Sequence, residues 1–552
     1  MKKIYKYLTL GLIAGHVLGF SACNTLDEPS TTESPKTYTM TDTASKGDDP
    51  TTRALGFGSD GKLNATWTAG DAVQVYHVFN PGTPSEMEST TPDGTLYAQS
   101  SGATTTLTGT FTSSYTPAAG DVLRLRFNDK PNYTNQEGTL DYIAANCDYA
   151  TAEITVDAVD AVTGNVTAAG IAEFANQQAI VKFSLKHPDG TTPVAATSLT
   201  VKVGSTTYNV TPTTAASDIY IAIKKASNKT VSLKATDGAD HYRYEKSGIS
   251  FAVGQYYAIG VKMTSLNLST LSSDFTALDG DVLTGTLDGD TQPYKISIAD
   301  GATVTLSGVT INGTNSNSCM WAGITCLGDA TIVLDEGTTN TVRGFYYAYP
   351  GIQPAAGKTL TIEGTGTLNA SNNGSAAGIG SVDPVSCGDI HIKSGNITAT
   401  GSGLNSGIGS GHYSSCGTIT ISGGNVTAYG GTSSAAIGCA NGGSCGAILI
   451  EGGTVSATAT HSSNSTCIGG NGIDSYCPSV TFTRGITRMT LTNANEISIC
   501  DFISASDHIM ADTHDIVNKR SNAVNWLFNY DSTFTGLFPN TSFSTGTWTI
   551  AP

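Results

Sequence analysis

Cys387-Gly388-Asp389-Ile390-His391-Ile392 recurs as Cys416-Gly417-Thr418-Ile419-Thr420-Ile421 and again as Cys445-Gly446-Ala447-Ile448-Leu449-Ile450. The step between copies is 29 residues, from position 387 to 416 and from 416 to 445. A second marker accompanies the copies, as Gly378-Ile379-Gly380, Gly407-Ile408-Gly409, Ala436-Ile437-Gly438 and Cys467-Ile468-Gly469. Segments with an apolar residue at every second position are short β-strands that cannot bury a core alone. Their regular recurrence predicts a solenoid of stacked rungs.

The spacing favours a right-handed parallel β-helix over residues 265–490. In a parallel stack, Ile390, Ile419 and Ile448 would form one continuous interior ladder. A β-propeller is the rival architecture, but each blade needs four antiparallel strands and about 40 residues. The observed period is too short for such a blade.

The cysteines of the repeat form a column. Cys387, Cys416 and Cys445 share one rung position, and Cys477 is one residue out of step. Neighbouring rungs lie about 4.8 Å apart, and a disulfide accepts Cα separations of about 4.4–6.8 Å. Disulfides between adjacent rungs and stacked free thiols are therefore both compatible with the column. No metal site is predicted, because the column has neither a CxxC pair nor histidines in one register.

The Gly-Ile-Gly and Cys-Gly pattern resembles the β-helical carbohydrate-binding domains of bacterial surface proteins, and the resemblance implies sugar binding. Two candidate surfaces follow from the register. The first is an aromatic row, in which Trp321 and Tyr349 each lie three residues before a marker isoleucine, with Tyr346 and Tyr347 close by. Flat aromatic rows suit sugar rings, although the same residues could pack beneath another part of the chain.

The second candidate surface is a polar column. Asp383, His412 and Asn441 each lie four residues after a marker isoleucine, so they should stack on successive rungs. Such a column could hydrogen-bond a glycan or hold a cation, and solvated turn residues are the alternative interpretation.

An enzyme is not expected. Polysaccharide lyases and hydrolases with this fold need clustered acidic residues, and hydrolases need a carboxylate pair about 5–10 Å apart. The acidic residues of the strong repeats share no register on neighbouring rungs; they are Asp383, Asp389, Glu451 and Asp474. No catalytic residue, metal or cofactor is therefore predicted.

Residues 52–264 read as an all-β sandwich, because segments such as 72–76, 122–127 and 179–185 alternate apolar and polar residues between turn signals. Thr52-Arg53-Ala54, Trp67-Thr68-Ala69-Gly70-Asp71-Ala72-Val73-Gln74-Val75 and Asn176-Gln177-Gln178-Ala179-Ile180-Val181-Lys182-Phe183 resemble fimbrillin-like proteins of gut and oral bacteria. The resemblance implies a lipoprotein precursor, and some such proteins are cut after an arginine and polymerise by strand donation. Arg53 lies where that cut would fall, although an ordinary surface arginine fits the position as well.

The N-terminus reads as a lipoprotein signal peptide over residues 1–22. Three lysines precede a short apolar run from Leu8 to Phe20, which is shorter than the roughly 20 residues of a membrane-spanning helix. Gly19-Phe20-Ser21-Ala22-Cys23 resembles the bacterial lipobox, which implies acylation of Cys23, and Asn24 resembles the residue found in lipoproteins sorted to an outer membrane. Residues 23–51 are predicted to be a flexible tether, and residues 491–552 a C-terminal cap over the solenoid.

The net charge of the chain excludes some classes of binding partner. A net charge of −17 argues against nucleic acid or an anionic membrane surface. We therefore expect a lipid-anchored protein of the outer membrane, exposed at the cell surface, that acts as an adhesin or glycan-binding protein. The alternatives are a fimbrial accessory or tip subunit assembled by strand exchange after cleavage at Arg53, and, less favoured, a polysaccharide lyase or hydrolase. The expected partners are a host or bacterial surface glycan, the membrane through the lipid, and fimbrial subunits.

Overall fold

The computed structural model describes residues 36–45, 56–57, 63–113, 116–129, 131–459, 465–470, 475–493, 514–517, 527–530 and 546–550. The protein is all-β, as predicted, and the one α-helix of the described residues is α1 (Leu140–Asn146). The described chain divides into two compact units, of which the first contains residues 36–45, 67–126 and 152–173. Within these residues, no helix is long and apolar enough to cross a membrane.

The first unit is built on most of a sheet whose path is β11-β1-β7-β6-β4-β8-β10-β13, with β12 beside β1 and β5 beside β4. Strand β13 and the residues of β10 that pair with it, Ala150 and Thr151, belong to the second unit. This path closes on itself, because β11 pairs with both β1 and β10. The strands are β1 (Lys36–Ser45), β4 (Ala72–Phe79), β5 (Met87–Glu88), β6 (Gly94–Ala98), β7 (Thr104–Ser113), β8 (Val122–Phe127), β10 (Ala150–Val159), β11 (Asn165–Ala168), β12 (Ala172–Glu173) and β13 (Ala175–Asn176). A separate pair is formed by β2 (Gly56–Phe57) and β3 (Leu63–Asn64).

Strand β1 corrects the prediction of a flexible tether, which is wrong for residues 36–45. All ten residues of β1 pair antiparallel with β7, from Lys36 opposite Ser113 to Ser45 opposite Thr104. Burial alternates along the strand, and the inward side chains belong to Tyr38, Met40, Asp42 and Ala44. The alternation of apolar and polar residues is hard to see in the sequence, because one of the four inward residues, Asp42, is polar and threonines lie between them. Threonine itself nevertheless favours strands.

The second unit begins with a sandwich, as predicted. A sheet of three strands, in the order β17-β14-β20, and a sheet of six, in the order β21-β19-β18-β15-β16-β9, enclose a shared apolar core. Thr139 caps α1 by accepting a hydrogen bond from the Tyr142 amide. The strands are β9 (Asn135–Gln136), β14 (Gln178–Lys186), β15 (Ser198–Val203), β16 (Thr206–Val210), β17 (Asp218–Lys224), β18 (Ala226–Asp237), β19 (Asp240–Phe251), β20 (Tyr256–Lys262) and β21 (Thr264–Ser265).

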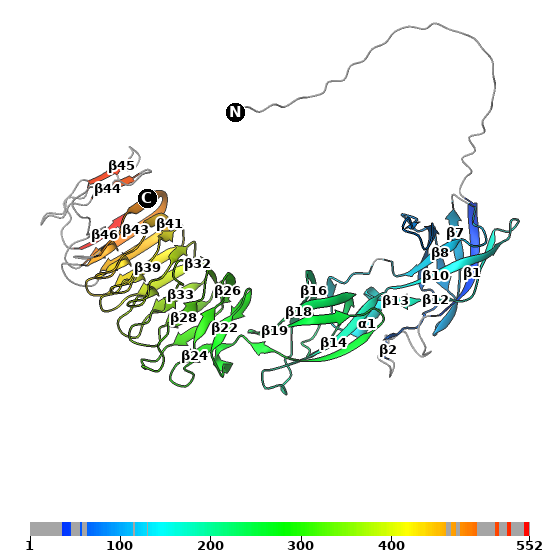
Figure 1. The fold of residues 1–552 in the computed structure, drawn as a ribbon, viewed down its shortest axis with the longest axis horizontal. Helices are drawn as coiled ribbons and strands as arrows, with labels where there is room; N and C mark the ends of the chain where they lie inside the picture. Colours follow the sequence, from blue (N-terminus) through cyan, green and yellow to red (C-terminus); the bar gives the residue numbers. More distant parts are fainter. Residues whose placement is uncertain are drawn as a thin grey trace, which may run out of the picture. The chain divides into compact units, whose positions relative to one another are not determined.

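The rest of the second unit is a parallel β-helix, which confirms the predicted solenoid (Figure 1). Ile390, Ile419 and Ile448 pair directly in one ladder of fully buried side chains. One parallel sheet contains β22 (Phe275–Ala277), β25 (Ile296–Ile298), β28 (Ile324–Cys326), β31 (Ile352–Gln353), β34 (Ile379–Gly380), β37 (Ile408–Gly409), β40 (Ala435–Gly438) and β42 (Thr466–Gly469).

The larger sheet supplies the other faces of the β-helix. Its strands β41 and β39 are neighbours, so two parallel stacks meet in one sheet. Its members are β23 (Asp281–Leu283), β24 (Thr286–Asp288), β26 (Ala302–Leu306), β27 (Thr310–Asn312), β29 (Ala330–Leu334), β30 (Thr339–Arg343), β32 (Thr359–Gly364), β33 (Thr367–Ser371), β35 (Asp389–Ile392), β36 (Asn396–Thr400), β38 (Ile419–Ile421), β39 (Asn425–Gly430), β41 (Ile448–Ala459), β43 (Val480–Asn493) and β46 (Gly546–Ile550).

The solenoid changes at both ends. At its start, the 3-10 helix η1 (Leu268–Thr270) precedes β22, and Arg243 of β19 forms an ion pair with the buried Asp281 of β23. At its far end, β43 continues the parallel stack on β41 and pairs antiparallel with β46. The strands β44 (His514–Val517) and β45 (Leu527–Tyr530) pair antiparallel with each other. Most of the predicted cap lies outside the described residues.

Candidate functional site

The polar column lies on the turns that follow the marker strands β34, β37 and β40. The structure brings Asp383 and His412 together on neighbouring rungs, with 3.7 Å between Oδ2 of Asp383 and Nδ1 of His412. The backbone amide of His412 donates a hydrogen bond of 2.8 Å to Oδ1 of Asn405, which is itself buried. A carboxylate and an imidazole are therefore held side by side on an accessible edge of the β-helix.

Tyr413 joins this pair, although the sequence did not single it out. Its ring lies 3.9 Å from the His412 ring, centroid to centroid, and 64 % of the residue is exposed. Its backbone has φ +50 and its amide donates a hydrogen bond of 3.2 Å to the Asn441 carbonyl. A non-glycine residue at positive φ is uncommon and is held by its surroundings.

Gly442 explains how the tyrosine ring reaches its position. A Cβ at Gly442 would lie 2.4 Å from Cδ1 of Tyr413, so only a glycine leaves room for the ring. From the next rung, the Asn441 carbonyl thus accepts the Tyr413 amide, and Gly442, which has no side chain, leaves room for the Tyr413 ring. The third predicted member of the column, Asn441, contributes its backbone to this arrangement.

The chemistry of the cluster Asp383–His412–Tyr413 suits recognition of hydroxyl-rich molecules. A carboxylate accepts hydrogen bonds from hydroxyls, imidazole donates or accepts them, and an exposed aromatic face packs on the apolar face of a sugar ring. Asp389, the nearest acidic residue in sequence, is occupied by accepting the Thr418 amide at 2.7 Å. Among the described residues, no group of three or more His, Cys, Asp or Glu side chains could hold a metal ion.

The aromatic row is arranged differently from the expected flat strip. Trp321 packs against the solenoid core, its ring 5.6 Å from that of the buried Phe345, and its Nε1 atom is buried without a hydrogen-bond partner. Tyr347 is 54 % exposed and its ring lies over Gly374. Tyr346 and Tyr349 are half-buried. Tyr347 is therefore the ring of this group that faces solvent most fully.

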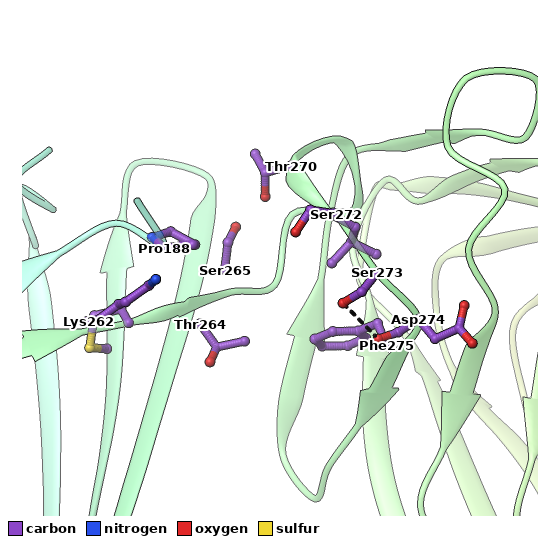
Figure 2. Close-up of a pocket in the computed structure, with 11 residues that line it drawn as sticks. Pro188, Lys262, Thr264, Ser265, Thr270, Ser272, Ser273, Asp274 and Phe275 are labelled. Carbon is purple, nitrogen blue, oxygen red and sulfur yellow. Dashed lines mark hydrogen bonds between the residues drawn. The ribbon is translucent and has the colours of Figure 1, made fainter. Parts of the chain in front are cut away.

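A pocket of about 300 Å³ lies where the sandwich strands β20 and β21 lead into η1 and β22. Lys262 and Asp274 line it from opposite sides in Figure 2. The hydroxyl-bearing residues of the wall are Thr264, Ser265, Thr270, Ser272 and Ser273. These hydroxyls, one ammonium and one carboxylate share the wall with the apolar side chains of Pro188, Met263, Leu271 and Phe275, so the lining is mixed rather than polar. No sequence signal marks this pocket, because its residues come from Pro188 and from segments 262–265 and 270–275, which precede the recognisable repeats.

Cys23 and Arg53, the predicted lipidation and processing residues, lie outside the described residues. All nine cysteines of the described part are buried. The last strand before Arg53 in the described residues is β1, which ends at Ser45.

Comparison with known proteins gives remote structural neighbours. No protein-family model matches the chain, and no curated protein matches it in sequence. A candidate cell adhesion protein from Bacteroides uniformis is 14 % identical with a TM-score of 0.24, over 43 % of this chain and 98 % of that one. A fimbrial protein from Bacteroides ovatus is 11 % identical with a TM-score of 0.22, over 41 % of this chain and 49 % of that one.

A third structural neighbour comes from a different genus. A variant of the shaft pilin SpaA from Lactobacillus rhamnosus GG is 12 % identical with a TM-score of 0.20, over 42 % of this chain and 98 % of that one. The similarity is low in every case.

Proposed function

We propose that the protein is a cell-surface adhesin of fimbrial type, an accessory or tip subunit that assembles by exchange of β1 and displays its β-helix. One observation carries the proposal. Strand β1 lies wholly before Arg53, and it is paired on both sides, with β7 along its full length and with β11 and β12 on the other edge. Cleavage after Arg53 would therefore break the covalent link between β1, an interior strand, and the other strands of its sheet.

Loss of β1 would leave a strand-shaped vacancy. The backbone groups of β7 and β11 would lose their partners, and the inward positions now filled by Tyr38, Met40 and Ala44 would be empty. Unpaired edges of this kind accept an added strand, and alternate side chains determine which strand fits. A fully buried methionine contributes about 1.5–3 kcal/mol, so the vacancy favours a donor strand with an apolar residue at every second position.

The precursor would be anchored by lipid on Cys23 and exposed on an outer membrane. Cleavage after Arg53 would remove the acylated residue together with β1, so release from the lipid and opening of the sheet would be one event. The apolar run before Cys23 and the small residues at the cut support this anchor.

Processing and assembly can be tested with Arg53→Ala and, as a matched control, Lys46→Ala. In the producing bacterium we expect the wild type and the control to yield a mature N-terminus at Ala54 and polymers that resist mild detergent. Arg53→Ala should remain a full-length monomer. Polymers of unchanged abundance in Arg53→Ala would contradict the proposal.

A second function, glycan binding by the β-helix without catalysis, is favoured by the cluster Asp383–His412–Tyr413. In a glycan-array screen of the protein, Tyr413→Ala should weaken binding roughly tenfold, because an aromatic contact contributes about 0.5–1.5 kcal/mol beyond its buried area. Tyr347→Ala is the control, since it removes another ring that is more than half exposed. Loss of binding only in Tyr347→Ala would move the site to the aromatic row, and product formation from a bound polysaccharide would contradict the non-enzymatic assignment.

A further inference from the structure

One turn of the β-helix differs from its neighbours in a single residue. The turn between β40 and β41 begins with Cys439, and Cys445 lies near its end. In the two preceding rungs, the matching first position is a serine, Ser381 and then Ser410, while the position that matches Cys445 is a cysteine in both. Only this turn, among the three, has a thiol at both positions.

The two sulfur atoms are in contact. Sγ of Cys439 lies 2.7 Å from Sγ of Cys445, and both residues are buried, at 0 % and 5 % exposed. A disulfide requires sulfur atoms about 2.0 Å apart, so a small side-chain rotation would bring the two sulfur atoms to bonding distance. The backbone of the turn is fixed independently, since the Cys439 amide donates to the Gly469 carbonyl and the Cys445 amide to the Tyr476 carbonyl.

We propose that Cys439 and Cys445 form a disulfide that closes this turn beneath Tyr413. The two thiols lose two protons and two electrons to form one S–S bond. The acceptor is a disulfide-bearing oxidant, protein or small molecule, which is reduced to two thiols through a mixed-disulfide intermediate. The bond lies within one rung, so it differs from the cross-links between adjacent rungs that the cysteine column suggested.

Burial determines when the reaction takes place. Desolvation raises the pKa of both thiols, and the Cys477 thiol lies close to each of them. Thiolates are the reactive species, so the folded pair is inert to exchange and the bond forms while the turn is still open. Once formed and buried, the bond is protected from reductants in the same way.

The position of the bond connects it with the glycan-binding cluster, and this step rests on the second proposed function. The residues enclosed between the two cysteines include Asn441 and Gly442, whose carbonyl and missing side chain support Tyr413. Fixing both ends of the turn restricts the positions that these two residues can adopt. The disulfide is thus a device that holds the aromatic ring of the cluster in place before a ligand arrives.

The bond is tested on the exported protein by denaturing it without a reductant, blocking free thiols with an alkylating reagent, and mapping the peptides by mass spectrometry. We expect Cys439 and Cys445 to escape alkylation and to appear as one cross-linked peptide. Cys439→Ser copies the residue of the neighbouring turns and should fold; it should make Cys445 fully alkylated. Cys416→Ser is the control and should leave the cross-link intact.

Two results would overturn the proposal. One is complete alkylation of Cys439 and Cys445 in the unreduced wild type, and the other is a cross-link that joins Cys445 to Cys477 or Cys416 instead. Neither depends on any glycan, so the disulfide and the glycan-binding function can fail separately. If both hold, Cys439→Ser should bind the glycan several-fold more weakly than Cys416→Ser.

Discussion

His391 is a half-buried ionisable side chain, and its protonation should make the β-helix sensitive to acid. Its Nε2 atom lies 2.9 Å from Oγ of Ser422, and burial, followed by Lys393, lowers its pKa below the usual 6.5. A histidine with a lowered folded-state pKa stabilises the fold fully above its unfolded pKa, and that stability is lost as the pH falls through the folded value. We expect the melting temperature to fall as the pH is lowered from about 7.5 to about 5.

The matched variant is His391→Thr, because the residues paired with His391 on the adjacent rungs are Thr361 and Thr420. Thermal unfolding followed by circular dichroism over this pH range should show a smaller decrease in the variant. His77 and His241, whose pKa values burial also lowers, should account for the remaining sensitivity. An identical decrease in both proteins would show that His391 takes no part.

Arg243 shows how burial of an ion pair determines its effect on the free energy of unfolding. Asp281, its partner, is 1 % exposed, and burial raises the pKa of this carboxyl even though Arg243 lowers it. Removing one partner of a buried ion pair costs about 3–5 kcal/mol, because it leaves a buried charge uncompensated. We expect Arg243→Met to lower the free energy of unfolding in denaturant by that amount.

Arg124→Met is the control for this measurement. Arg124 is about as exposed as Arg243, but its partners Glu86, Glu88 and Glu153 are 26–56 % exposed, whereas Asp281 is 1 % exposed. Pairs with exposed carboxylates contribute about 0–1 kcal/mol each. The double variant Arg243→Met with Asp281→Leu should recover most of the loss, since it removes both charges. A cost for Arg243→Met no larger than that for Arg124→Met would contradict the buried-pair account.

Strand β1 gives the strand-exchange proposal its own stability test. Met40 is fully buried in the precursor, and replacing a buried methionine by alanine costs about 2–5 kcal/mol. Met40→Ala should therefore destabilise the uncleaved protein in denaturant unfolding. Once β1 has been replaced by a donor strand, position 40 no longer belongs to the fold, so polymers made from the variant should be as stable as those of the wild type. Equal destabilisation of precursor and polymer would mean that β1 stays in place.

The sequence predicted the elements of the β-helix well, because one physical constraint repeats in it. Every rung must place an apolar residue inside at the same step, and Ile390, Ile419 and Ile448 reveal that step directly. Strand β1 was missed because it has no second copy and buries Asp42 among its inward residues. Tyr413 was missed for another reason. Its position depends on Gly442 and Asn441 of the next rung, and the repeat register alone does not predict which exposed side chain will pack over a glycine.

Two properties of the chain, its anchor and its assembly, depend on the same short N-terminal segment. Residues 23–53 contain the predicted lipid attachment at Cys23, all of β1 and the predicted cleavage residue Arg53. A diacylated or triacylated cysteine holds a protein firmly in a membrane, since each buried methylene contributes about 0.8 kcal/mol. A chain cut after Arg53 should leave that lipid behind. In detergent phase partitioning, an antibody against the β-helix should find Arg53→Ala in the detergent phase and the processed wild type in the aqueous phase. Cys23→Ala should give an unacylated chain in the aqueous phase without cleavage, so a detergent-phase signal from Cys23→Ala would show that the anchor lies elsewhere.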